Sequence, residues 1–255
     1  MRVGYNTSYA RGRQWPVYMK GRIVNDIESY SGDPARARAA RARQLSPRVF
    51  NFAVSGLIFL GFCVMGLGTY FTGTMTFARM MYSGSGAMGF ILGTLIGTVV
   101  GIFVMSAGAK RQSVAMSLVG YALFASTFGL MASTALIAYD LPTINTAFAA
   151  TAAVTVVFGA LGVTFPNLFK RIPGVLCGAL LGLILVELVL AIAGVPQTVT
   201  DYLVVIVFAG FIGFDTYQAT QVEPTLPNAV MAATNLFLDI INVFMRILAI
   251  VGNRD

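Results

Sequence analysis

Long runs of apolar residues alternate with short polar breaks along most of this chain. Seven runs, each about 20 residues or longer, follow one another, and each is long enough to cross a bilayer as a helix. They cover residues 50–72, 86–108, 113–138, 143–165, 173–195, 200–220 and 227–251. The pattern predicts an all-α integral membrane protein with seven transmembrane helices.

The composition supports this fold class. Of the 255 residues, 57% are hydrophobic and 11% are charged, whereas about 25% of the residues in a soluble domain are charged. Backbone polar groups must be satisfied inside a bilayer, so spans are helices or closed barrels, and the continuous apolar runs favour helices. Cys63 and Cys177 lie in separate runs and are expected to act as small buried hydrophobic residues.

The first 48 residues are basic and hold ten of the 17 Lys and Arg residues of the chain. We predict a disordered cytoplasmic tail over 1–48 that contacts anionic headgroups, followed by a seven-helix membrane domain over 49–252. A mitochondrial transit peptide is the alternative, and Asp26, Glu28 and Asp33 weigh against it. No basic groove with interleaved aromatic residues follows, so nucleic acid is not an expected partner.

The charges of the connecting loops predict the orientation of the chain. With the N-terminus inside, the inner loops carry Lys110, Arg111, Lys170 and Arg171, whereas the short outer loops carry only Arg79. Lys and Arg concentrate in cytoplasmic loops. We therefore expect the N-terminus in the cytoplasm and the C-terminus outside.

Histidine is absent from the chain. Its absence excludes Ser–His catalysis, Cys–His catalysis and the HExxH zinc motif. We therefore expect neither enzymatic activity nor a resident cofactor. Any response to pH near neutrality must come from carboxyl groups with unusual surroundings.

The last span carries a polar stripe formed by Asn235, Asp239, Asn242 and Arg246. Their spacing of four, three and four residues places all four side chains on one helix face. A carboxylate in the middle of a span is costly in lipid, so Asp239 is a functional-site candidate. Arg246 lies near the outer end and is expected to extend toward the outer surface.

Asp215 in the preceding span is the expected partner of Asp239. From the rise per residue, Asp215 lies about 8 Å and Asp239 about 18 Å from the inner ends of their spans. The loop QVEPTLP is long enough to offset this difference, so pairing is permitted. A pair would form a proton switch or a calcium site assisted by Asn235 and Asn242. The alternative is a structural hydrogen-bonded network.

Other charged residues near or inside the spans have simpler interpretations. Arg111 is expected either to bridge Asp215 or to anchor the inner end of span two beside Lys110. Glu187 is an additional intramembrane acid that we expect to be a packed, protonated hydrogen-bond donor. Asp140 and Asp201 lie at span ends and are expected to be solvated caps.

Two spans contain glycines at every fourth position. Small residues at this spacing allow helix backbones to approach closely in lipid, so we predict tight packing on both spans. A glycine-lined permeation path is the alternative. The ladders are Gly89, Gly93, Gly97 and Gly101 on span two, and Gly174, Gly178 and Gly182 on span five.

The segments GFIGFDTYQ and AATNLFLDIINVFMRILAIVG resemble the signature of the Bax inhibitor-1 family, also called the transmembrane Bax inhibitor motif proteins. In this chain Asp215, Asp239, Asn242 and Arg246 occupy the polar positions of that signature. The resemblance is specific over residues 210–252, is weaker over 50–209 and does not cover 1–48.

The resemblance implies a bundle with the last helix at its centre and a pH-sensitive calcium leak in a bacterial plasma membrane. It further implies that Asp215 and Asp239 share a proton and that Arg111 bridges Asp215. Calcium, protons and lipid are then the expected partners. Alternatives are a regulator of another membrane protein such as a protease, a proton-coupled transporter, and an intramembrane aspartyl protease, whose Gly-x-Gly-Asp motif differs from the Leu-Phe-Leu-Asp found here.

Overall fold

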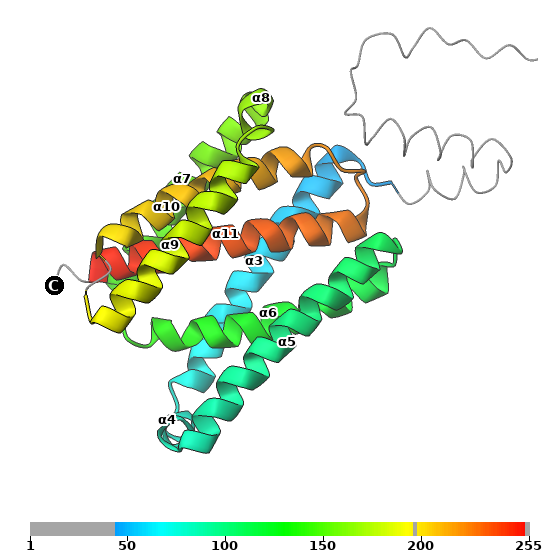
Figure 1. Cartoon of the computed structure of the whole chain (residues 1–255). Coiled ribbons are helices and arrows are strands. Elements are labelled where there is room, and N and C mark those ends of the chain that lie inside the picture. Colours follow the sequence, from blue (N-terminus) through cyan, green and yellow to red (C-terminus); the bar gives the residue numbers. More distant parts are fainter. Residues whose placement is uncertain (1–43, 196–197, 253–255) are drawn as a thin grey trace, which may run out of the picture. The chain divides into compact units, whose positions relative to one another are not determined.

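The computed structural model describes residues 44–195 and 198–252, which form helices joined by short turns (Figure 1). Seven of the described helices are long and apolar enough to cross a membrane, which confirms the predicted fold class. Their ends differ from the predicted ends by at most three residues. Residues 1–43 of the predicted basic tail lie outside the described residues. The helices are α3 (Pro47–Thr72), α4 (Met75–Tyr82), α5 (Gly84–Lys110), α6 (Val114–Leu136), α7 (Leu141–Thr164), α8 (Pro166–Phe169), α9 (Pro173–Ala193), α10 (Thr198–Ala219) and α11 (Leu226–Gly252).

Polar caps in the breaks determine where several helices begin and end. The Ser46 hydroxyl accepts a hydrogen bond from the Val49 N–H at the start of α3, and Asp140 accepts one from the Thr143 N–H at the start of α7. Each cap satisfies an N–H group that the first helical turn leaves unpaired. Gly194 ends α9 in the left-handed conformation, with φ 66°, which glycine adopts without strain.

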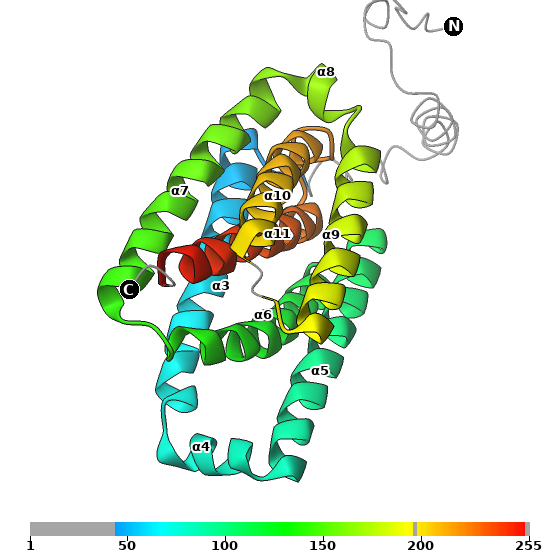
Figure 2. The ribbon, with the colours of Figure 1, turned by 60° about the vertical axis from the view of Figure 1, so that its left-hand side comes forward.

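Helix α11 lies between α10 and the α5–α6 pair, as the two ribbon views show (Figures 1 and 2). It packs against α3, α5, α6, α7 and α10. Half of its apolar window is buried inside the bundle, which is the largest buried share among the seven spans. Helix α11 is therefore the most enclosed of the seven spans.

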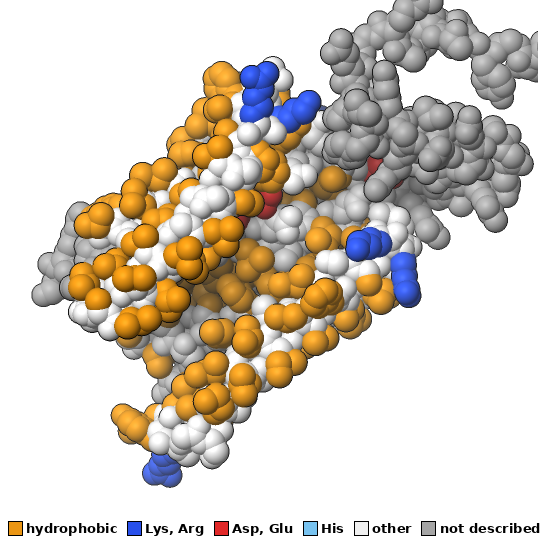
Figure 3. All heavy atoms as spheres, in the orientation of Figure 1, with side chains coloured by type: hydrophobic (Ala, Val, Ile, Leu, Met, Phe, Trp, Pro, Cys, Tyr) orange, Lys and Arg blue, Asp and Glu red, His pale blue; other side chains and the backbone are white. Residues whose placement is uncertain are grey.

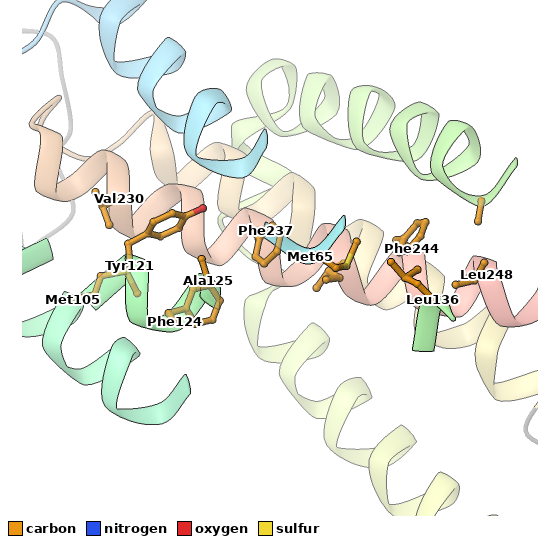
Figure 4. Packing of buried hydrophobic residues seen from close by; sticks show 12 residues of the cluster. Met65, Met105, Tyr121, Phe124, Ala125, Leu136, Val230, Phe237, Phe244 and Leu248 are labelled. Carbon is orange, nitrogen blue, oxygen red and sulfur yellow. The ribbon is translucent and has the colours of Figure 1, made fainter. Parts of the chain in front are cut away.

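Aromatic side chains fill the space around the middle of α11 (Figure 4). Phe237 is completely buried, and its ring meets those of Phe62, Phe124 and Phe128 edge to face. This arrangement places the positive edge of one ring against the negative face of another. Phe62 comes from α3, whereas Phe124 and Phe128 come from α6. The cluster therefore ties α11 to both helices.

Apolar side chains cover most of the helices on the face seen in Figure 3, and the Lys and Arg side chains on that face lie near helix ends. This distribution matches a protein surrounded by lipid along its spans. The short helix α4 was not predicted from the sequence, because eight residues are too few to form a span. Its Phe77 is buried, whereas Met75 and Tyr82 are exposed.

The two glycine ladders differ in what they contact. A Cβ added at Gly101 would lie 2.6 Å from the backbone nitrogen of Phe124, so α5 and α6 approach closely there. Gly97 is also tightly packed, against Thr127. On α9, by contrast, Gly174, Gly178 and Gly182 have no neighbour within 4 Å of an added Cβ. The prediction of tight packing is therefore correct for part of span two and wrong for span five, because α9 turns its glycines outward.

Replacing Gly101 by alanine should destabilise the bundle by about 1–3 kcal/mol, because the backbone of α6 leaves no room for the methyl group. Gly178→Ala adds the same methyl group to an open helix face and should leave stability unchanged or slightly raised. Thermal unfolding of both variants in detergent measures the difference. Equal midpoints for the two variants would contradict the packing described here.

Candidate functional site

The polar stripe on α11 has one strongly buried member. Asp239 is 7% exposed, whereas Asn235 is exposed and Asn242 and Arg246 are half-buried. The Asn242 side-chain amide donates to the Leu238 carbonyl at 2.7 Å, which satisfies it within its own helix. Asp239 is therefore the main candidate for a chemical role on this stripe. The amides of Asn235 and Asn242 lie on the same face of α11.

Asp215 of α10 and Asp239 of α11 lie within interaction range, close enough for their carboxyl groups to share a hydrogen bond. A hydrogen bond between two carboxyl groups needs a proton on one of them, because an ionised carboxylate can only accept. The Oδ2 atom of Asp239 is buried and has no hydrogen-bond partner among the described residues. We call Asp215 and Asp239 the carboxyl pair.

The α10–α11 loop explains how two acids at different distances from their helix ends come together. Asp215 lies four residues before the end of α10, and Asp239 lies thirteen residues after the start of α11. These intervals correspond to about 6 Å and about 20 Å along the helices. Residues 220–225 connect the helices; the connection begins with a turn and then continues without regular structure to the start of α11. A connection of six residues can span at most about 20 Å, which is more than the difference.

Arg246 joins three helices at the end of the bundle where α9 ends and α10 begins. Its Nη1 atom lies 2.7 Å from Asp201 Oδ1 on α10, and its Nη2 atom lies 2.8 Å from Glu187 Oε2 on α9. The side chains of Arg246, Glu187 and Asp201 are 27%, 15% and 8% exposed, respectively. The planar guanidinium suits such a double contact, because its donors lie in a fixed fork. We call these three residues the Arg246 cluster.

The Arg246 cluster corrects three expectations drawn from the sequence. Arg246 points to two acids inside the bundle and does not extend toward the outer surface. Glu187 accepts a hydrogen bond from Arg246 and is not the protonated donor that we expected. Asp201 is buried and ion-paired, not a solvated cap. The sequence shows only that all three lie near one end of their spans, so the pairing could not be predicted.

Arg111 is exposed and follows the last turn of α5 as its C-cap. It forms no ion pair with Asp215 among the described residues. Arg111 ends α5 and Asp215 belongs to α10, and these two helices lie on opposite sides of α11 (Figures 1 and 2). The structure thus does not form the predicted Arg111–Asp215 bridge, and Arg111 has the position of an anchor at a helix end.

The carboxyl pair offers few fixed ligands for a metal ion. No group of three or more His, Cys, Asp or Glu side chains within the described ranges is arranged to hold one. Calcium takes about six to eight oxygen ligands, so the pair would need water or carbonyl oxygens in addition. With so few fixed ligands, the two carboxyl groups are better suited to a cation that binds transiently than to one that stays bound.

Asp140 is an acid outside the spans with a different environment. It is exposed, and hydrogen bonds from the Thr143 side chain and backbone lower the pKa of Asp140. It is therefore charged near neutral pH and loses its charge only well into the acidic range. Asp140 lies at the same end of the bundle as the Arg246 cluster and serves below as a control residue.

Comparison with known proteins provides independent information about the family. Residues 48–255 match the sequence profile of a family described as inhibitor of apoptosis-promoting Bax1. The inner membrane protein YbhL of Escherichia coli K12 is 28% identical over 177 residues, which cover 65% of this chain and 75% of YbhL. An uncharacterized membrane protein of Streptococcus pyogenes serotype M3 is 29% identical over 171 residues, covering 64% of this chain and 74% of that protein.

Proposed function

We propose, from the premise that this chain belongs to the Bax inhibitor-1 family of membrane proteins, that it is a pH-sensitive calcium leak controlled by Asp215 and Asp239. The observation that carries the proposal is the proximity of these two carboxyl groups within the membrane-spanning bundle. Two acids placed together in a low-dielectric region are uncommon outside functional sites. The chain has no histidine that could sense pH in their place.

The pair can act as a switch because its protonation changes the force between α10 and α11. With one shared proton, a hydrogen bond holds the two helices together. Without the proton, two like charges repel at short distance in a medium of low dielectric constant. The pair therefore titrates as a unit, and a change in its proton count alters the packing of α10 on α11.

Calcium and protons compete for the same oxygens in this proposal. Calcium prefers charged carboxylates, so calcium binding at the pair should weaken as pH falls. The amides of Asn235 and Asn242 lie on the same face of α11 and supply neutral acceptors to an ion moving along it. Arg111 is not needed for this switch, because it stands away from the pair.

The test is calcium flux into liposomes that contain the purified protein, measured from about pH 5 to about pH 8. Wild-type flux should depend on pH, and Asp215→Asn should remove most of that dependence, because an amide can neither ionise nor share a proton. Asp140→Asn is the matched control. It removes an acid whose pKa lies below this range and should leave the pH profile unchanged.

A wild-type pH profile in Asp215→Asn would overturn the proposed switch. If the folded variant carries no calcium at any pH, Asp215 is needed for permeation itself and is not the pH sensor. Size-exclusion chromatography of each variant before reconstitution ensures that folded proteins are compared.

A further inference from the structure

The Arg246 cluster lies farther along the same helix face as the carboxyl pair. Arg246 follows Asp239 by seven residues, which corresponds to about 10 Å along α11 and returns to nearly the same direction. Asn242 lies between them on the stripe. An ion that followed the stripe from Asp239 toward the end of the bundle would therefore meet the cluster.

Helix α9 depends on few contacts for its position. None of its residues is buried, and its main packing partner is α10. The contact between Glu187 and Arg246 links α9 directly to α11 across the end of the bundle. Figure 3 shows the surface hollowed between α9 and α5, where α11 runs between them. Because α9 packs mainly on α10 and hardly on α11, the ion pair bridges two helices that otherwise have little contact.

The geometry points to a gate: the Arg246 cluster closes the end of the polar stripe by holding α9 and α10 against α11. This inference rests on the proposed function, because it assigns the cluster to the ion path that the carboxyl pair controls. The cluster holds one positive and two negative side chains. Arg246 is thus the residue that keeps two like charges together.

The charges of the Arg246 cluster predict how far each variant opens this end of the bundle. Glu187→Gln removes the link to α9 and leaves Arg246 paired with Asp201. Arg246→Gln removes both ion pairs and leaves two acids near one another without the positive charge between them, so their mutual repulsion is no longer offset. Arg246→Gln should therefore open this end more than Glu187→Gln. Arg246→Lys keeps the charge without the two-pronged geometry and should have an intermediate effect.

Opening can be measured without ion flux by the accessibility of a single thiol. The reporter is Asn242→Cys in a protein with Cys63→Ala and Cys177→Ala, held in lipid nanodiscs so that a membrane-impermeant thiol reagent reaches both faces. Loss of one partly buried ion pair should speed labelling about tenfold in Glu187→Gln, and loss of both should speed it further in Arg246→Gln. Asp140→Asn removes an acid at the same end that forms no ion pair with any described residue, and labelling should stay at the reference rate.

Labelling rates that match the reference protein in both Glu187→Gln and Arg246→Gln would overturn the gate. If Arg246→Gln does not fold, Glu187→Gln and Asp201→Asn decide the question, because each leaves one ion pair in place. The readout also separates this inference from the proposed function. Faster labelling in a protein without calcium flux supports the gate and contradicts the leak, whereas pH-dependent flux with unchanged labelling supports the leak and contradicts the gate.

Discussion

Replacing either Asp215 or Asp239 by asparagine should remove nearly as much of the pH dependence of calcium flux as replacing both. The two carboxyl groups lie close enough to interact, so we expect their protons to belong to the pair and not to either residue. Once one acid is gone, the other has no like charge beside it and no proton to share. This is the largest functional effect that we expect from single substitutions in the chain.

A double-mutant cycle measures this coupling directly. Flux would be titrated in the wild type, in the two single variants and in the double variant. Residues that act as a unit give strongly non-additive effects. If the two substitutions instead shift the pH profile independently, so that the double variant shows the sum of the two shifts, the acids act separately and do not share a proton.

Phe237→Ala should be the most destabilising substitution in the middle of the bundle, with an expected cost of about 3–5 kcal/mol. The side chain is completely buried, and its ring contacts Phe62, Phe124 and Phe128. In lipid the loss comes mainly from dispersion contacts, because lipid is as apolar as the protein interior. The cavity would remove packing contacts that α11 makes with both α3 and α6.

A matched control for Phe237→Ala is Phe59→Ala on α3. Phe59 is 71% exposed on the surface that we assign to lipid, so its removal leaves no internal cavity and should have little effect. Thermal unfolding of the two variants in detergent provides the comparison. A Phe59→Ala variant that unfolds as easily as Phe237→Ala would show that the cluster around α11 does not dominate stability.

The seven spans could be predicted because each is a long apolar run with a polar break at both ends. Capping residues such as Ser46 and Asp140 mark those breaks, which explains why the predicted ends fall within three residues of the helix ends. The common face of Asn235, Asp239, Asn242 and Arg246 followed from helical spacing alone. These features are local, and local sequence determines them.

The remaining features depend on how helices face one another, which spacing does not determine. Glycines repeat on α5 and α9 in the same way, yet only α5 turns part of its ladder toward a neighbour. Arg246 could have extended outward, but two acids from α9 and α10 hold it inside. The sequence placed Arg111 and Asp215 in one leaflet, whereas the structure separates them by placing α11 between their helices. Each outcome depends on contacts between helices that are not adjacent in the chain.

The most direct test of the proposed leak is calcium flux into liposomes containing the wild type or the Asp215→Asn/Asp239→Asn double variant, measured from about pH 5 to about pH 8. We expect flux that changes with pH in the wild type and flux that does not change with pH in the double variant. If a folded wild type carries no calcium at any pH, the proposed leak is wrong. If both proteins carry calcium and respond equally to pH, the carboxyl pair does not control the leak and is a structural contact.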